Sequence, residues 1–299
     1  MSQIYAQFGI SKQAHSAAIQ RMRQTADKEL LYVGFILKIR QIHPGMGLRL
    51  MYEQFDPEGI GRDAFISLGL RNGFRLKIAP NPIITTRSVS YCLYPNLIVD
   101  MKLTVVNRLW VSDLFYFHLN GKHYCVVLIM DVYSRRIVGY NAANNMRAEQ
   151  NVKALQMALQ LRGIKDYQKK LIHHSDRGGQ YISEAYTSLL SDYGIQISMC
   201  TNVLDNSYME RVNGTIKNSY LKLWPIENEL QLTTQYIHKA IDGYNNRQHQ
   251  SLGKKTPIEF ETYVKELSEK DRPELRVFTV SNSNRNSDNP NQLSLFEGL

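Results

Sequence analysis

Three acidic residues lie where separate segments of the chain could bring their carboxylates into one pocket. Asp113 stands inside an apolar run, Asp176 directly follows another, and Glu210 opens a helical stretch. Carboxylate oxygens are hard donors, which suit magnesium or manganese rather than zinc. Two such ions about 4 Å apart can activate an attacking oxygen and stabilise a leaving one at a phosphodiester. We therefore expect Asp113, Asp176 and Glu210 to be the catalytic residues and the ligands of two Mg²⁺ or Mn²⁺ ions.

Each acid has an ordinary alternative when it is considered alone. Asp113 could face water from an edge strand, Asp176 could belong to a simple turn beside two glycines, and Glu210 could be a solvated helix residue. An unpaired Asp inside an apolar strand would cost on the order of several kcal/mol, and a bound cation, a hydrogen-bonding partner or solvent could remove that cost. The prediction of a metal site therefore depends on the three acids as a set.

A fourth acid, Asp131, also ends an apolar run and competes for the metal role. Ser134 and Arg135 follow it closely, in a sequence typical of a turn. An Asp at such a position accepts hydrogen bonds from turn amides. We expect Asp131 to cap a turn, and we expect Glu184 and Asp192 to be solvated on an amphipathic helix.

The acids need a fold that brings distant segments together, and the apolar pattern predicts one. Alternating runs indicate an antiparallel meander of three strands, followed by helices that alternate with two further strands. That order predicts an α/β mixed sheet flanked by helices. The expected strands are 109–117, 123–131, 137–143, 170–174 and 195–200, and the expected helices around them are 148–161, 183–193, 233–249 and 256–267.

Three motifs carry a resemblance to a known family. They are WVSD at 110–113, HSDRGGQY at 174–181 and DNSYMER at 205–211. These motifs resemble the signatures of DDE transposases, and more narrowly those of the OrfB-type insertion-sequence transposases, which share the retroviral-integrase catalytic core. A C-terminal pattern at 244–257 is also similar, so the resemblance extends over residues 40–262.

The resemblance implies a fold and a reaction. The fold would be ribonuclease-H-like, with a mixed five-stranded sheet, small helical N-terminal modules and a helical C-terminal extension. The activity would be metal-dependent hydrolysis at the ends of an insertion sequence, followed by transesterification of the freed 3′-hydroxyl into target DNA. Joining two DNA ends implies a homo-oligomer, a dimer or higher, on the DNA. Two rival functions are a nuclease of this fold that cuts without joining, and a catalytically inactive DNA-binding relative.

Several polar residues are candidates for DNA contact. Lys217 follows Glu210 by seven residues, which is two helical turns, so both lie on one face and the lysine could hold a phosphate near the metals. A surface lysine with no such role is the ordinary alternative. The other candidates are Arg211, Asn213, Asn206, Arg177, Arg247, Lys12 and Gln13.

The remaining chain divides into smaller modules. Residues 4–23 could form a helix-turn-helix, with Ser11 capping its second helix, or an ordinary helical hairpin, and a separate helix is expected at 27–41. The expected organisation is a helix-turn-helix-like segment at 1–42, a second helical module at 43–80, a linker at 81–105, the catalytic core at 106–224, a C-terminal helical extension at 225–268 and a flexible tail at 269–299.

Composition agrees with a DNA partner. The formal net charge is +9 and the pI is near 9.3, which favours a polyanion through phosphate contacts and counterion release. The three cysteines, Cys92, Cys125 and Cys200, form no CxxC pair and are expected to be reduced. No stretch is apolar and long enough to cross a bilayer, so we expect no membrane association and a cytoplasmic, nucleoid-associated protein.

The tail contains one apolar cluster in a polar sequence. Gln292, Leu293, Leu295 and Phe296 resemble the pentapeptide by which bacterial proteins bind the replicative sliding clamp. Leu295 and Phe296 could fill a surface pocket on such a partner. The alternative is a tail that folds back onto its own core or onto a partner subunit.

Overall fold

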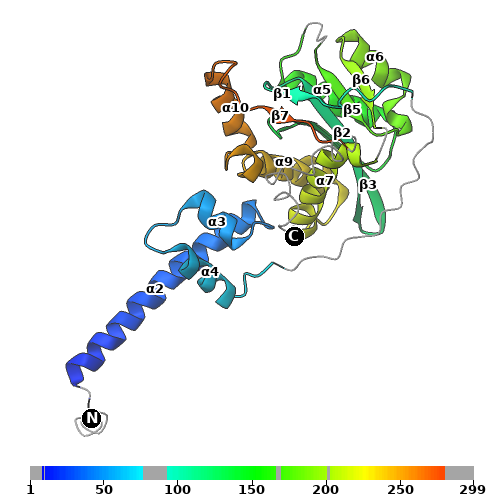
Figure 1. The fold of residues 1–299 in the computed structure, drawn as a ribbon. Helices are drawn as coiled ribbons and strands as arrows, with labels where there is room; N and C mark the ends of the chain where they lie inside the picture. Colours follow the sequence, from blue (N-terminus) through cyan, green and yellow to red (C-terminus); the bar gives the residue numbers. More distant parts are fainter. Residues whose placement is uncertain (1–8, 10, 77–92, 166–169, 201–202, 280–299) are drawn as a thin grey trace. The chain divides into compact units, whose positions relative to one another are not determined.

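The computed structural model describes residues 9, 11–76, 93–165, 170–200 and 203–279, and the chain forms two compact units, 1–80 and 81–299 (Figure 1). The described part of the N-terminal unit contains the helices α2 (Lys12–Ile42), α3 (Leu48–Phe55) and α4 (Arg62–Arg71). Their shared core includes the fully buried side chains of Ile36, Met51 and Phe65.

Helix α2 is longer than the sequence predicted. The hydroxyl of Ser11 accepts a hydrogen bond from the amide of Ala14 at 3.0 Å, which confirms Ser11 as the helix N-cap. The expected break between 23 and 27 is absent, because residues 24–26 include neither glycine nor proline to interrupt the helix. The part of the predicted helix-turn-helix that precedes Gly9 lies outside the described residues.

The second unit is built on a five-stranded sheet in the order β4-β3-β2-β5-β6. Strands β2 (Leu109–Leu119), β3 (Lys122–Asp131) and β4 (Ile137–Ala143) form an antiparallel meander, while β5 (Ile172–Ser175) and β6 (Gln196–Met199) are parallel to β2. Asn120 and Gly121 both have positive φ, 50° and 76°, at the tight turn between β2 and β3. The predicted mixed sheet is confirmed, with each strand within a few residues of its expected bounds.

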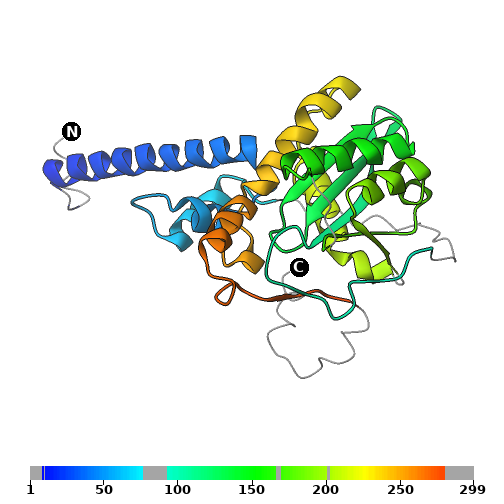
Figure 2. The same ribbon diagram turned by 90° about the horizontal axis from the view of Figure 1, so that it is seen from above.

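Helices cover both faces of the sheet (Figures 1 and 2). On one face, α5 (Ala148–Leu161) and α6 (Glu184–Asp192) pack against a cluster that contains Trp110. The other face carries α7 (Ser207–Ser219) and α9 (Ile237–Asn245), whose cluster contains Val111. Successive residues of β2 therefore face opposite layers, and the central strands are buried on both sides.

Gly139 in β4 allows α5 to lie close to the sheet. A Cβ atom at this position would lie 2.2 Å from the carbonyl oxygen of Ala154 in α5. Such a distance is far inside van der Waals contact, so only glycine permits this approach of helix and strand.

The C-terminal extension packs on the α7 side of the sheet through α10 (Pro257–Glu266). Its start is fixed by a capping box, in which the side chain of Thr256 and that of Glu259 each bond the other residue's amide. After α10, β7 (Leu275–Arg276) pairs antiparallel with β1 (Lys102–Leu103). Strands therefore form within the segments that the sequence predicted to be a linker and a tail.

Short helical segments complete the second unit. The expected helix at 233–249 is divided into α8 (Glu229–Gln231), the π-helical η4 (Leu232–Tyr236) and α9, and the 3₁₀ turns are η1 (Gly179–Tyr181), η2 (Val203–Asn206), η3 (Leu221–Leu223) and η5 (Gln250–Leu252). Within the described ranges, every helix is too short or too polar to cross a membrane. Cys125 and Cys200 are buried free thiols, as predicted, and Cys92 lies outside the described residues.

Candidate active site

Strand pairing brings two of the three predicted acids together. In the parallel pair of β2 and β5, Ser112 lies opposite Ser175. Asp113 and Asp176 each follow one of these serines, so they are neighbours at the same place on adjacent strands. Helix α7 packs on the face of β2 that contains Val111 and carries Glu210 in its first turn. Three segments that are distant in sequence therefore converge at the middle of β2.

The charged form of Asp113 is disfavoured by its surroundings. Burial and the negative charges of Asp176 and Glu210 together raise its pKa to about 7, against the opposing hydrogen bond from the amide of Leu114. The side-chain amide of Asn213 also donates to Asp113 Oδ2 at 2.8 Å. Because nearby negative charges raise the pKa of a carboxyl group, these contributions indicate that Asp176 and Glu210 both lie near Asp113.

Asp176 is held by its own loop. The amide of Gly178 donates to Asp176 Oδ1 at 2.9 Å, which opposes the rise in pKa that burial causes. The neighbouring Arg177 donates through Nε to the carbonyl oxygen of Cys200 at 2.8 Å. The carboxylate is thus fixed just after the end of β5, the strand that pairs with β2.

Glu210 differs from the other two acids because its side chain is exposed. Its place in the first turn of α7 is favourable for a negative charge, since the helix dipole is positive at that end. Asn206 caps the same helix and donates from its side chain to the carbonyl oxygen of Ser112 at 3.2 Å. That contact ties the start of α7 to the strand that carries Asp113.

The donor set suits a hard divalent cation. Asp113, Asp176 and Glu210 form no ion pair with any described residue, so no cationic side chain in the described part of the chain balances their charges. The amide oxygens of Asn206 and Asn213 are buried and accept no hydrogen bond within the described ranges. Oxygen donors of this kind fit Mg²⁺ or Mn²⁺.

The ligands are nevertheless not arranged as a closed cage. Over the described residues, no three His, Cys, Asp or Glu side chains are grouped closely enough to hold one metal ion. The electrostatic coupling of Asp113 to both other acids shows proximity, which is a weaker condition than coordination geometry. The assignment of the three acids as metal ligands stays a prediction.

The predicted DNA-contact residues occupy three kinds of environment. Arg211 is exposed on α7, while Lys217 and Arg247 are half-buried. Asn206 and Asn213 are buried, with exposed fractions of 4% and 7%, and bond to the strand of Asp113 as described above. Lys12 and Gln13 are exposed in the first turn of α2, in the other unit.

The histidines of β5 are structural groups. His174 Nδ1 lies 2.8 Å from the hydroxyl of Ser198, and His173 Nε2 lies 2.8 Å from the hydroxyl of Tyr186. Burial lowers the pKa of His173 to about 3 and that of His174 to about 4. Both rings are therefore neutral near pH 7 and are committed to partners in the core.

Asp131 caps a turn, as the sequence predicted. Its Oδ1 accepts hydrogen bonds from the amides of Tyr133 and Ser134 at 3.0 and 3.1 Å, and its Oδ2 accepts one from the amide of Asn107 at 2.6 Å. Arg162 lies 3.8 Å from the same carboxylate.

The sequence did not indicate the charged network behind Asp131. Arg162 Nη1 donates to Glu261 of α10 at 2.8 Å, and Arg136 Nη1 donates to the same carboxylate at 2.7 Å. Arg162 and Glu261 are 99 residues apart, so no local pattern could have paired them. The network joins the C-terminal extension to the sheet.

Comparison with known proteins gives a consistent result. An integrase core domain family model matches residues 104–202, and a second integrase core domain model matches residues 193–257. The 31 kDa protein of insertion element IS600 from Shigella sonnei is 31% identical over 264 residues, which cover 85% of this chain and 95% of that protein. A protein of insertion sequence element IS986/IS6110 from Mycobacterium tuberculosis is 34% identical over 52% of this chain, but the chain spans only 58% of its length.

Structural comparison addresses the fold alone. The simian T-cell lymphotropic virus intasome, solved in complex with PP2A regulatory subunit B56 gamma, matches with a TM-score of 0.52 at 14% identity. The match covers 75% of this chain and 71% of that chain. Together with the strand order and the helices on both faces, this likeness confirms the predicted ribonuclease-H-like fold.

Proposed function

Because the chain belongs to the insertion-sequence transposases with an integrase core domain, we propose that it cleaves the ends of an insertion sequence and joins them to target DNA. The observation that carries this proposal is the pairing of β2 with β5, which places Asp113 beside Asp176 on the strand that α7, with Glu210 in its first turn, packs against. The raised pKa of Asp113, which burial, Asp176 and Glu210 cause together, agrees with this arrangement. Three neighbouring carboxylates that form no ion pair with a described residue suit divalent metal ions held at a phosphodiester.

The acids would hold two Mg²⁺ or Mn²⁺ ions, which supply Lewis-acid chemistry at the scissile phosphate. Asn213 keeps Oδ2 of Asp113 in a fixed direction, and the amide of Gly178 does the same for Oδ1 of Asp176. Lys217 and Arg211, farther along α7, would hold the phosphates of the bound strand. We assign Asn206 and Asn213 to positioning α7 and Asp113, because both side chains are buried.

The nucleophiles would be water and a DNA hydroxyl rather than a protein side chain. Burial raises the pKa of the Cys125 thiol to about 11 and also raises the pKa values of Cys200 and Tyr181, so these groups stay protonated near pH 7. In the first step, water attacks phosphorus, the P–O3′ bond breaks and the freed 3′-oxygen takes up a proton. In the second step, that 3′-hydroxyl attacks a target phosphodiester, loses its proton and displaces the target's own 3′-oxygen.

The test is a cleavage and strand-transfer assay with labelled duplexes that contain the ends of the encoding element, in Mg²⁺ and in EDTA. We expect both products from the unaltered chain in Mg²⁺, and at least about a thousandfold less of each from Asp113→Asn, Asp176→Asn and Glu210→Gln, since the metal site serves both steps. Glu184→Gln, which removes an exposed acid of α6, is the matched control and should retain activity.

The outcomes separate the rival functions. Cleavage without joined product would favour a nuclease of the same fold. Absence of metal-dependent products, with DNA binding retained, would favour an inactive DNA-binding relative. Full activity in all three acid variants would exclude the proposed site.

We further propose that the chain acts as a dimer or higher oligomer on DNA, because two ends must be joined at one target. The segment with Gln292, Leu293, Leu295 and Phe296 lies outside the described residues, and clamp binding stays a prediction. Deletion of 291–299 should abolish binding of the purified sliding clamp on a biosensor surface, and unchanged binding would contradict it.

A further inference from the structure

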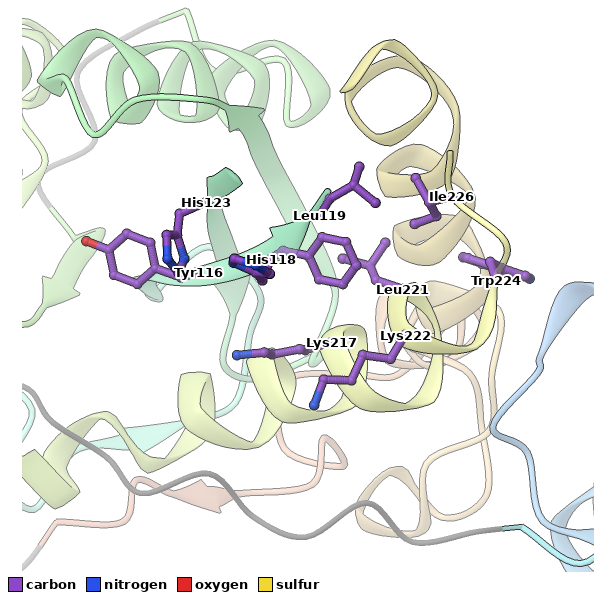
Figure 3. Close-up of a pocket in the computed structure, with 10 residues that line it drawn as sticks. Tyr116, His118, Leu119, His123, Lys217, Leu221, Lys222, Trp224 and Ile226 are labelled. Carbon is purple, nitrogen blue, oxygen red and sulfur yellow. The ribbon is translucent and has the colours of Figure 1, made fainter. Parts of the chain in front are cut away.

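A cavity of about 480 Å³ is lined by the end of the β2–β3 hairpin and by the segment from Lys217 to Ile226 (Figure 3), and none of the three acids is among its lining residues. We call this cavity the hairpin pocket. Two groups of polar and aromatic side chains line it. The hairpin contributes Tyr116, His118 and His123, and the segment from the end of α7 onward contributes Lys217, Lys222 and Trp224. The sequence motifs indicated no function for five of these residues, namely Tyr116, His118, His123, Lys222 and Trp224.

The two lysines of the hairpin pocket repel each other. Burial lowers the pKa of Lys217, and the positive charge of Lys222 lowers it further. Neither ammonium group forms an ion pair within the described part of the chain. Two cations that share a concave surface without an internal counter-charge attract an anion from solution.

The hairpin contributes further hydrogen-bond donors and flat rings to the pocket. His118 and His123 are paired across β2 and β3, with ring centroids 4.6 Å apart. Tyr116 packs edge to face against His123 at 6.4 Å. These three side chains are exposed, so the imidazole N–H groups and the ring faces are accessible. N–H donors of this kind bind phosphate oxygens, and aromatic side chains stack on nucleotide bases.

The distance from the acids sets the position on a DNA strand. Lys217 lies seven residues after Glu210 on α7, a rise of about 10 Å, and His118 lies five residues after Asp113 on β2, about 16 Å. A strand of duplex DNA advances about 3.4 Å per nucleotide. The hairpin pocket therefore lies about three to five nucleotides from a phosphate held at the acids.

We propose that the hairpin pocket binds the sugar-phosphate backbone of the DNA strand that passes through the active site, with Lys222, His118 and His123 as its phosphate-binding residues. The inference rests on the proposed function for the identity of the strand, and it extends the DNA contact beyond Lys217. The aromatic rings of Tyr116 and Trp224 flank the path of the strand. The ligand class is an anionic nucleic acid backbone and not a small free anion, because the charged groups are distributed along a wall.

The test measures binding of a fluorescein-labelled element-end duplex to the full chain by anisotropy in EDTA, where cleavage cannot occur. We expect Lys222→Ala and the double variant His118→Ala/His123→Ala each to weaken binding about fivefold or more. The salt slope of log Kd should fall by about one for Lys222→Ala, since one phosphate contact is lost. Lys265→Ala, which removes an exposed lysine of α10, is the matched control and should change Kd by less than about twofold.

A second arm locates the contact. Neutral methylphosphonates are introduced one at a time at two to seven nucleotides from the cleavage site. One or two of them should weaken binding to the unaltered chain, and the same substitutions should have no further effect on Lys222→Ala. Equal effects in both proteins would overturn the inference, as would an unaltered Kd in the pocket variants or an absence of DNA binding by the unaltered chain.

A third arm compares inorganic phosphate with DNA. Competition by phosphate at concentrations near the nucleotide concentration would show a small-anion site and overturn the assignment to a DNA backbone. The inference and the proposed function fail separately. A chain that binds DNA through the pocket without cleaving it supports the pocket alone, and a chain that cleaves and joins DNA with pocket variants unimpaired in binding refutes the pocket alone.

Discussion

Asp113 and Asp131 are two aspartates on paired strands of one sheet, and their surroundings differ in charge. Burial is the first cause that raises the pKa of each carboxyl group. For Asp113, the next cause is another negative charge, Asp176, which adds to the cost. For Asp131, the next causes are the charge of Arg162 and the amides of Asn107 and Ser134, which oppose it.

The comparison separates an acid that has cationic partners in the fold from an acid that has none among the described residues. Around Asp131, two carboxylates and two guanidinium groups balance, and although burial alone would raise the pKa of Glu261, hydrogen bonds and charge from Arg162 lower it. Around Asp113, the negative charges of Asp176 and Glu210 add to the effect of burial, and none of the three acids forms an ion pair with a described residue. Residues of the fold supply the opposing charges at the first site, whereas we propose that a bound divalent ion supplies them at the second.

The largest expected effect comes from removing the acid that the fold compensates. Asp131→Ala should lower the free energy of unfolding by about 3–5 kcal/mol, because it leaves Arg162 partly uncompensated and three amides without acceptors. Urea denaturation followed by circular dichroism measures the change. Asp192→Ala, at an exposed position of α6, should change it by less than about 0.5 kcal/mol. Equal losses for both variants would remove the distinction between the two acids.

A second prediction concerns the residue that orients Asp113. Asn213→Ala should weaken Mg²⁺ binding by about 10–100-fold, because the carboxylate loses the hydrogen bond that fixes Oδ2. Isothermal titration calorimetry with MgCl₂ gives the affinity. In EDTA, Asn213→Asp should have a lower free energy of unfolding than Asn213→Ala, since it adds a fourth negative charge. Unchanged Mg²⁺ affinity in Asn213→Ala would show that the amide does not position a metal ligand.

The third prediction reverses the sign of the first. In EDTA, Asp113→Asn should raise the free energy of unfolding by about 1 kcal/mol or more, because it removes a half-buried charge that two neighbours repel. The same urea experiment measures it. In saturating MgCl₂ the ranking should invert, since only the unaltered chain gains binding energy from the ion. A loss of stability for Asp113→Asn in EDTA would mean that the carboxylate has a compensating partner.

The sequence could identify both acids but not what surrounds them. Asp113 and Asp131 stand out locally, as acids within or at the end of apolar runs, and the turn amides that bind Asp131 are only two and three residues away. The five-stranded sheet was predictable for the same reason, because apolar periodicity is a local signal.

Long-range partners were not predictable in this way. Arg162 and Glu261 meet across 99 residues, and Asn213 was expected at the DNA surface but is buried against Asp113. The rotation of α7 about its own axis decides which residues face β2, and tertiary packing sets that rotation. The hairpin pocket has the same origin, since His118 and Lys222 become neighbours only when η3 follows α7 past the end of the sheet.

The finest probe of the comparison is the pH dependence that Asp113 contributes. Its folded pKa is about 7 against an ordinary value of 3.8, so the folded chain binds more protons between these values than the unfolded chain does. The stability that protonated Asp113 provides is present below about pH 4 and is lost as pH rises to about 7.

The difference in unfolding free energy between Asp113→Asn and the unaltered chain isolates this contribution, because the buried histidines titrate equally in both proteins. Measured in EDTA from pH 4 to pH 8, the difference should grow in favour of Asp113→Asn up to about pH 7 and then remain constant. MgCl₂ should stabilise the unaltered chain more at pH 8 than at pH 5.5, because the ion competes with the proton for the carboxylate. A difference that is flat from pH 4 to pH 8 would place the charge of Asp113 in a compensated environment like that of Asp131.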